Sequence, residues 1–224
     1  MVRKIKTIKK IYYIDNTIQC LDYVRYGNDL LADKKYDSYL CIDPGWKQLG
    51  IAYFRLVKGS VAKNIDDIFT QCIYLVMATV YLSGYNDSED EMIIKIYDFA
   101  RSCEAEFESI DAVIIENQTM WAKNKWLQGA LSGAFICHDR RVYSVKLSKL
   151  RVIGCLNQPD DPFIYNADRK YRKKDCRVRI INKFIEMGKI TPSNAIIDVN
   201  ARRYDCTDAF LLLYMTVNDG KKDK

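Results

Sequence analysis

A short apolar run that ends directly on a carboxylate is the feature of this sequence that most constrains its fold. Residues 112–115 are Ala-Val-Ile-Ile, and Glu116 follows them at once. A continuous apolar run of this length is typical of a strand covered on both faces of an α/β sheet. A second apolar run, residues 39–42, ends on Asp43 in the same way. Because functional groups gather at strand ends in such sheets, the sequence predicts a site that contains both acids.

Hydrophobic periodicity predicts the remaining elements. The Asp43-Pro44-Gly45 turn and the apolar residues that follow it indicate a hairpin that opens the sheet. Ser88 and Glu91 have the spacing of a capping box, which marks a helix start. The further elements are strands at residues 49–54, 71–77 or slightly beyond and 141–145, and helices at residues 88–107, 125–137, 174–187 and 205–217.

The length of 224 residues fits one large domain or one domain with an extension. Residues 1–37 mix basic and apolar side chains and are interpreted as a basic N-terminal arm or accessory helical segment. Residues 38–218 are predicted to form the main domain, and residues 219–224 a frayed tail. The loop-like region 148–166 contains two prolines and has no assigned role.

Composition excludes disordered and membrane-spanning classes. Hydrophobic residues make up 49% and charged residues 29%, as in globular proteins. The longest nearly apolar stretch, residues 72–82, is shorter than the roughly 20 residues of a membrane span. No secretory signal is expected, because Asp15 and Asn16 break the apolar run near the N-terminus. We therefore expect an intracellular protein, in the cytoplasm, with a nucleus or organelle left open.

Cysteine and histidine chemistry is disfavoured. The eight cysteines are scattered without a C-x-x-C pair, and the single histidine, His138, directly follows Cys137, which is not a zinc-ligand spacing. With one histidine and no nucleophile turn beside it, Ser-His-Asp and Cys-His catalysis have little support. Catalysis must then rest on carboxylates or lysines.

Four carboxylates fit one metal site: Asp43, Glu116, Asp205 and Asp208. Asp205 and Asp208 are three residues apart, so a helix places them on one face. Converging carboxylates need cations to neutralise them, and hard oxygen ligands select Mg²⁺ or Mn²⁺. We expect two Mg²⁺ ions, with Mn²⁺ able to substitute. Such a pair suits phosphodiester hydrolysis, with Asp43 bridging both ions. Taken singly, these acids equally fit a turn, a strand end and a helix N-terminus.

Positive charge is clustered where a polyanion could bind. The formal charge is +6, from 35 basic and 29 acidic residues. The candidate phosphate contacts form two clusters, one near the N-terminus and one after the loop region. They are Arg3, Lys4, Lys6, Lys9 and Lys10, and Arg169, Lys170, Arg172, Lys173, Lys174, Arg177 and Arg179. A solvated helix face explains an isolated basic run equally well.

Aromatic and basic residues also follow Glu116 closely. Trp121 and Trp126 could stack on unpaired bases while Lys123 and Lys125 hold phosphates. The alternative is that both tryptophans are core or dimer residues. Gly129 and Gly133 suggest close packing of their helix, either within the chain or across a dimer.

These motifs resemble those of the RuvC-like Holliday junction resolvases of the RNase H superfamily, closest in pattern to the poxvirus-type viral branch. The resemblance covers residues 39–217. The matching motifs are Ile42-Asp43-Pro44-Gly45 with Gly50-Ile51-Ala52, Ile114-Ile115-Glu116-Asn117-Gln118, Arg172-Lys173-Lys174 and Asp205-Cys206-Thr207-Asp208-Ala209. It implies an α/β, RNase H-like fold: a five-stranded mixed sheet, with an opening antiparallel hairpin and then parallel strands, flanked by helices on both faces.

The resemblance also implies an activity. Members of this family are Mg²⁺-dependent endodeoxyribonucleases of DNA recombination and repair, so the resemblance implies a homodimer with two ions per site that resolves four-way DNA junctions by paired symmetric nicks. The viral branch implies a viral replication compartment as an alternative to the cytoplasm. The four acids map onto the family's metal ligands, and Lys174, with Lys173, onto a basic stretch at the catalytic site. Gln118 matches a polar position near the second acid and is counted among the nucleic-acid contacts.

Three rival functions remain open at this point. The first is an RNase H-like nuclease for other branched or hybrid nucleic acid, and the second is a non-catalytic protein that binds branched DNA. The third is an actin-like-fold ATPase, which also begins with an acidic turn between two strands. That class generally needs a second glycine-rich phosphate loop, and none is found in the sequence.

Overall fold

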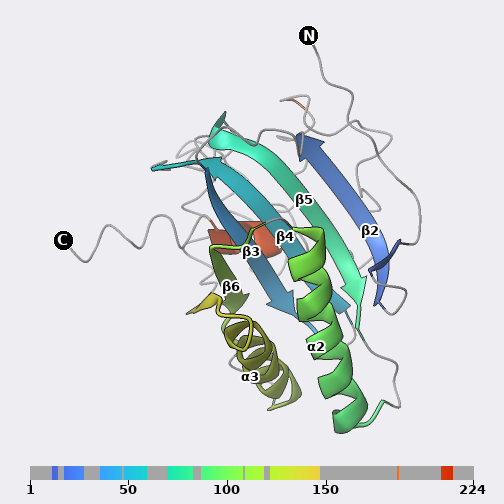
Figure 1. Ribbon diagram of the computed structural model, residues 1–224. Helices are drawn as coiled ribbons and strands as arrows, with labels where there is room; N and C mark the ends of the chain where they lie inside the picture. The colour runs from blue at the N-terminus through green and yellow to red at the C-terminus, as the bar shows by residue number, and fades with distance from the viewer. Residues whose placement is uncertain are drawn as a thin grey trace, which may run out of the picture.

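A seven-stranded sheet with the strand order β1-β2-β5-β4-β3-β6-β7 forms the centre of the protein (Figure 1). The computed structural model describes residues 12–14, 18–27, 36–46, 48–59, 70–82, 87–107, 109–118, 122–146, 186 and 208–213. The elements are β1 (Tyr12–Ile14), β2 (Ile18–Gly27), β3 (Tyr36–Pro44), β4 (Gln48–Val57), β5 (Cys72–Tyr81), α2 (Glu89–Glu106), β6 (Ala112–Glu116), α3 (Ala122–Ile136) and β7 (Arg141–Val145). Residues 208–213 form a further helical segment, called helix 208–213 below.

Five neighbouring strands confirm the predicted mixed sheet. Strand β4 pairs antiparallel with both β3 and β5, so the sheet opens with a hairpin. Strand β6 then pairs parallel with β3, and β7 pairs parallel with β6. Figure 1 shows α2 and α3 on one face of this sheet and helix 208–213 on the other. The five-stranded part therefore has the RNase H-like architecture that the sequence predicts.

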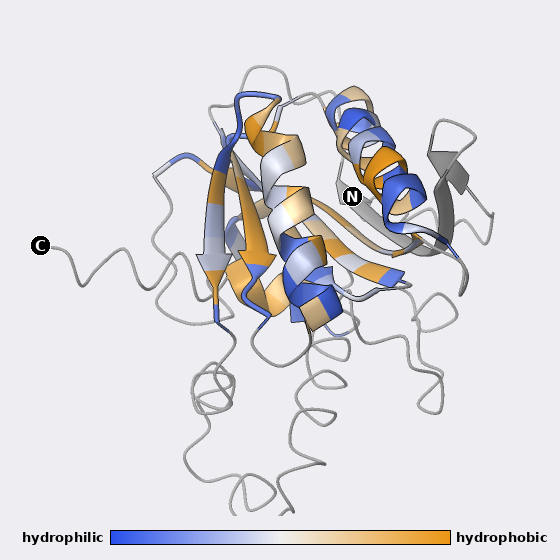
Figure 2. Cartoon of the chain, turned by 90° about the horizontal axis from the view of Figure 1, so that it is seen from below, coloured by the Kyte–Doolittle hydropathy of each residue, from blue (hydrophilic) through white to orange (hydrophobic). Residues whose placement is uncertain are grey.

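The main hydrophobic core lies between the sheet and the pair α2 and α3. Leu40 and Ile42 of β3 are fully buried in it, as is Phe99 of α2. Phe99 packs edge-on against Phe135 of α3, with ring centroids 6.2 Å apart. Both helices carry hydrophilic as well as hydrophobic residues (Figure 2), as expected of elements that have one buried face. This layer fixes which side of β3 and β6 faces α2 and α3.

Helix 208–213 covers the opposite face of the sheet. Its residues from Ala209 to Leu213 are fully buried, which agrees with the expectation of a helix that is apolar on every side. Phe210 packs against Phe54 of β4, with ring centroids 5.2 Å apart. The thiol of Cys41 on β3 lies at the backbone of Leu213, and burial raises the pKa of this thiol well above its ordinary value. Cys41 is therefore a neutral packing residue.

The N-terminal segment departs from the helical interpretation. Within residues 1–37, the described part is two strands, β1 and β2, followed by the start of β3. Strand β2 pairs antiparallel with β5, which would otherwise be an edge strand with unpaired backbone groups. Residues 18–27 contain Ile18, Val24 and two tyrosines, residue types that favour strands. Pairing with β5 therefore prevails over the mixed basic and apolar pattern that suggested a helix.

Helix α2 begins as the sequence predicts. The Ser88 hydroxyl accepts a hydrogen bond from the Glu91 backbone, and the Glu91 carboxylate accepts one from the Ser88 backbone. The predicted helix at residues 125–137 starts earlier, at Ala122. The loop 148–166 and nearly all of the predicted helix 174–187 lie outside the described residues. No helix within the described ranges is both long and apolar enough to cross a membrane.

Candidate active site

Asp43 and Glu116 occupy corresponding positions at the carboxyl ends of two neighbouring parallel strands. Ile42 of β3 is the register partner of Ile115 of β6, and each acid is the next residue along its strand. Adjacent strands lie roughly 5 Å apart, so the backbones carrying the two carboxylates are close neighbours. We call this pair of strand ends, with Asp43 and Glu116, the acidic edge. Both of its acids are half-buried.

The pleat of the strands sends both acids toward the same face of the sheet. Successive side chains of a strand point to opposite faces. Ile42 and Ile115 belong to the core under α2 and α3, so the residues that follow them face the other way. Asp43 and Glu116 thus lie on the face that helix 208–213 covers. The predicted meeting of the first two acids is supported by this register and pleat.

Helix 208–213 brings a third acid to this face. Asp208 is its first described residue and is only 1% exposed. A buried carboxylate is normally paired, hydrogen-bonded or bound to a metal. The packing of Phe210 and Leu213 against β4 and β3 fixes the helix, and Asp208 with it. Asp205, which the sequence places one turn earlier, lies outside the described residues.

The donor chemistry of these acids suits a hard divalent cation, but the described residues alone do not complete a site. All the candidate ligands are carboxylates, the oxygen donors that Mg²⁺ and Mn²⁺ prefer. Within the described part of the chain, no three carboxylate, thiol or imidazole side chains are grouped so that they could hold a metal ion. Asp43, Glu116 and Asp208 are therefore not brought together as a group of three ligands, and the four-ligand set with Asp205 stays a prediction.

A chain of amide groups positions Glu116. The Gln118 side chain donates a hydrogen bond to the Glu116 carboxylate, with Nε2 and Oε2 3.1 Å apart. The backbone N–H of Gln118 donates to Oε1 of Gln128 on α3 at 2.9 Å. Gln128 in turn donates to the hydroxyl of Ser144 on β7 at 2.8 Å. The sequence predicted Gln118 as a nucleic-acid contact. In the structure its amide binds the Glu116 carboxylate, and a contact with DNA stays a prediction.

Sequence reasoning did not find Gln128 or Ser144. Gln128 lies in a helix whose small residues drew attention, and Ser144 lies in a strand that was predicted only as an element. The available signal was the position of Gln128 two turns into the helix that directly follows Glu116. A long amide side chain there can reach back to the strand end that the helix leaves.

The turn between β3 and β4 holds a second group of residues at the acidic edge. The Gly45 N–H donates to the Gln48 carbonyl at 3.1 Å, which closes the turn. A Cβ atom at Gly45 would lie 2.6 Å from that carbonyl oxygen, so any other residue would force the turn to shift. The glycine therefore fixes where Trp46 leaves the turn, three residues after Asp43.

Trp46 connects this turn to α3. Its ring packs against Trp126 with centroids 5.8 Å apart, and both rings are partly buried against the core. The Lys123 ammonium lies over the Trp46 ring, 4.9 Å from its centroid. The packing of Trp126 fits the core interpretation better than a role in stacking on bases. Lys125 is exposed on the same helix, and Trp121 lies outside the described residues.

The other predicted contacts are outside the described residues. These are Lys174, which was assigned to the catalytic site, and the nucleic-acid contacts Arg169, Lys170, Arg172, Lys173 and Arg177. Their roles stay predictions. Gly129 and Gly133 are described, and a Cβ atom added at either would meet nothing within 4 Å. The prediction that these glycines pack closely within the chain is therefore wrong for the described residues, whereas the prediction of a dimer contact is untested.

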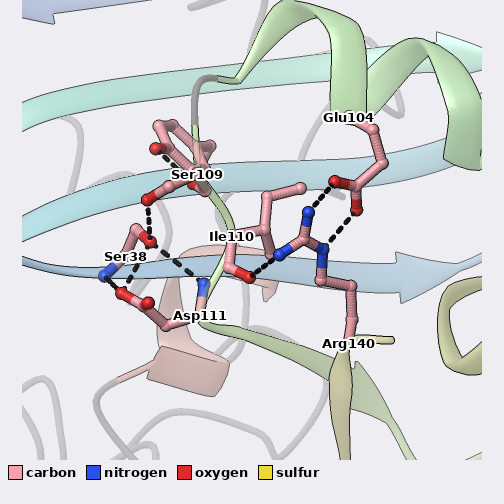
Figure 3. A network of polar contacts seen from close by, with 7 residues as sticks. Ser38, Glu104, Ser109, Ile110, Asp111 and Arg140 are labelled. Atoms are coloured by element: carbon pink, nitrogen blue, oxygen red, sulfur yellow. Dashed lines mark hydrogen bonds and ion pairs between the residues drawn. The ribbon is translucent and has the colours of Figure 1, made fainter. Parts of the chain in front are cut away.

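A different group of polar residues lies near the start of β6 (Figure 3). The Asp111 carboxylate accepts hydrogen bonds from the backbone and the hydroxyl of buried Ser38, at 2.7 and 2.8 Å. The Ser38 hydroxyl also contacts that of Ser109 at 3.0 Å. Arg140 donates to both carboxylate oxygens of Glu104 and to the Ile110 carbonyl. We call these contacts the amino-end network.

The electrostatics of the amino-end network are those of a structural element. The hydrogen bond to Glu104 raises the pKa of Arg140 above its ordinary value, so this guanidinium stays charged. Burial raises the pKa of Tyr53, whose phenol donates to the Ser109 carbonyl at 2.8 Å. Each carboxylate of the network thus accepts from donors that the fold itself supplies.

Comparison with known proteins gives a structural likeness only. No protein-family model and no curated protein matches the sequence. Among solved structures, the chain is similar to Thermus thermophilus RuvC, both alone and in complex with a Holliday junction substrate. Sequence identity is 18% in both comparisons, over 64% of this chain and 96% of the RuvC chain. The TM-scores are 0.39 for RuvC alone and 0.38 for the complex.

Proposed function

We propose that this protein is a metal-dependent endonuclease that resolves four-way DNA junctions by paired symmetric nicks. The observation that carries the proposal is the acidic edge: two carboxylates end adjacent parallel strands, on the face against which the helix carrying buried Asp208 packs. Four-way junction DNA as the substrate rests on the sequence motifs that resemble RuvC-like resolvases.

The residues of the acidic edge have distinct roles in this proposal. Asp43, Glu116, Asp208 and Asp205 would hold two Mg²⁺ ions, and Mn²⁺ would substitute. When bound, such ions supply a hydroxide nucleophile and neutralise the charge on the leaving oxygen. The Gln118 amide fixes the orientation of the Glu116 carboxylate. Lys174 and the basic residues that precede it would contact the phosphates of the substrate.

Three finer parts of the proposal come from the sequence and the substrate. A homodimer suits a two-fold symmetric junction, because two equivalent sites can then nick both strands. Among the described residues, nothing lies within 4 Å of a Cβ atom added at Gly129 or Gly133, which leaves room for such a contact. Membership of the poxvirus-type branch rests on the motifs alone. An intracellular location stays part of the proposal as a prediction.

A cleavage assay tests the function. The wild-type protein and Asp43→Asn are incubated with Mg²⁺ and a mobile four-way junction, a flap, a linear duplex or an RNA–DNA hybrid. We expect paired symmetric nicks on the junction alone, and none with Asp43→Asn. Binding of the junction in the absence of divalent metal should be unchanged in that variant.

The same assay separates the rival functions. Cleavage of the flap or the hybrid in preference to the junction would mean that the protein is a metal-dependent nuclease with a different substrate. Junction binding without cleavage in either Mg²⁺ or Mn²⁺ would favour a binding protein. ATP hydrolysis without any nicking would favour the actin-like alternative.

A further inference from the structure

The contact between Lys123 and Trp46 places a fixed positive charge beside the acidic edge. Trp46 belongs to the turn that follows Asp43, and Lys123 lies in the first turn of α3, seven residues after Glu116. The two elements leave the same edge of the sheet. The Lys123 ammonium lies 4.9 Å from the centroid of the Trp46 ring. An ammonium over the face of tryptophan is held by the ring quadrupole.

Trp46 is itself held rigidly. Its ring packs against Trp126 and against the core, and Gly45 fixes the turn that carries it. Lys123 is exposed and forms no ion pair within the described segments. A lysine side chain ordinarily samples many rotamers, so an aromatic support lowers the entropy that is lost when its ammonium binds an anion. The Lys123 side chain remains exposed to solvent, where an anion can reach it.

We propose that Trp46 is a positioning residue that holds Lys123 to bind one backbone phosphate of the nucleic-acid strand at the acidic edge. The inference rests on the proposed function, whose substrate supplies the phosphate. It assigns to Trp46 a role that differs from base stacking: a partly buried ring that already contacts Trp126 and the Lys123 ammonium has little face left for a base.

The test is the salt dependence of binding to a fluorescent four-way junction in EDTA, by anisotropy between 50 and 200 mM salt. Losing one phosphate contact makes the negative slope of log K against log[salt] shallower by about 0.9. Between 50 and 200 mM salt, the affinity of such a variant should therefore fall about 3.5-fold less than that of the wild type. Lys123→Met should show this loss while keeping the aliphatic packing. Trp46→Leu should lower the slope in the same direction, and the double variant should lower it no further than Lys123→Met.

Conservative and control variants make the result specific. Trp46→Phe and Lys123→Arg keep an aromatic face and a stackable cation, so both should retain most of the wild-type slope. Lys125→Met is the matched control, because Lys125 is an exposed lysine of the same helix and has no aromatic partner among the described residues. The effects of Lys125→Met and Trp46→Leu should add. Thermal unfolding of each variant checks the fold, and the Lys123 variants remain informative if Trp46→Leu does not fold.

Two results would overturn the inference. One is an unchanged slope for Lys123→Met; the other is additive losses for Trp46→Leu and Lys123→Met, which would mean that Trp46 acts independently. Failure of the proposed function is distinguishable, because nicking is measured separately in Mg²⁺. A protein with the predicted coupling that never nicks would contradict the nuclease alone, and a nicking protein with additive losses would contradict the role of Trp46 alone. Absence of any junction binding would overturn both.

Discussion

The two ends of strand β6 both carry acids, and their surroundings differ. At the start of β6, Asp111 accepts two hydrogen bonds from Ser38, and neighbouring Glu104 is paired with Arg140. At the other end, the described partner of Glu116 is the neutral amide of Gln118. The fold thus satisfies its acids at one end with its own donors and cations. At the other end, the described residues orient a carboxylate through an amide and supply no cation to it, which is the arrangement that a cation-binding site requires.

Replacing one acid at each end of β6 should produce the largest difference between variants, in cleavage at one end and in stability at the other. Glu116→Gln should lower junction cleavage on the order of 100-fold, because a ligand of the proposed metal site is lost. Its unfolding free energy should change little. Asp111→Ala should keep wild-type cleavage per folded molecule but lose about 1–3 kcal/mol of stability, since buried Ser38 loses its acceptor. Initial cleavage rates and urea unfolding measure the two effects, and equal cleavage by both variants would erase the distinction.

The support of Glu116 can be tested one step further away. Gln128→Leu removes the acceptor of the Gln118 backbone N–H and the donor to Ser144. Loss of such a supporting residue typically costs about 10–100-fold in metal affinity or activity. We expect cleavage to require more Mg²⁺, with junction binding in EDTA unchanged. A Mg²⁺ titration that matches wild type would show that the amide chain has no part in the site.

At the amino end the expected effect is on stability. Arg140→Met should cost about 2 kcal/mol, because Glu104 is left without its cation while only 16% of its side chain is exposed. Arg101→Met, in the ion pair with Asp98, is the control. Its side chain is 63% exposed, so its loss should cost about 0.5 kcal/mol or less. Urea unfolding compares the two, and similar losses would mean that the amino-end network contributes no more than an ordinary surface pair.

The smallest expected effect is the pH dependence of the helix cap. Hydrogen bonds from the Ser88 backbone and hydroxyl lower the pKa of Glu91 in the folded protein. The stabilisation by this carboxylate is therefore present above its unfolded-state pKa and is lost as the pH falls through the lower folded-state value. Thermal unfolding of Glu91→Gln should show a weaker dependence on pH in the acidic range than wild type does. A dependence that is identical in the two proteins would contradict the role of the cap.

Much of the fold could be predicted because local signals agreed with the tertiary structure. The apolar runs before Asp43 and Glu116, and the capping box at Ser88, each predicted an element that the structure confirms. The prediction for residues 18–27 was wrong although Ile18, Val24 and two tyrosines favour a strand, because the strand that pairs with this segment, β5, lies about 50 residues away in sequence. A short segment does not show by itself that a distant strand lacks a partner.

The candidate site could be predicted only as far as chemistry follows the ends of strands. Asp43 and Glu116 were visible because each follows an apolar run directly. Gln128 and Trp46 were not, because their roles come from contacts across elements that a single sequence does not display. The same limit explains the expectation for Gly129 and Gly133, where small residues suggested close packing and the structure has open space.

Binding of Mn²⁺, measured by isothermal titration calorimetry with electron paramagnetic resonance to count bound ions, tests the central claim most directly. We predict two ions per wild-type chain and per Asp111→Ala chain, and weakened or lost binding of at least one ion in Glu116→Gln. Glu116→Gln binding Mn²⁺ as the wild type does, or a wild-type protein that binds none, would contradict a metal site at the acidic edge.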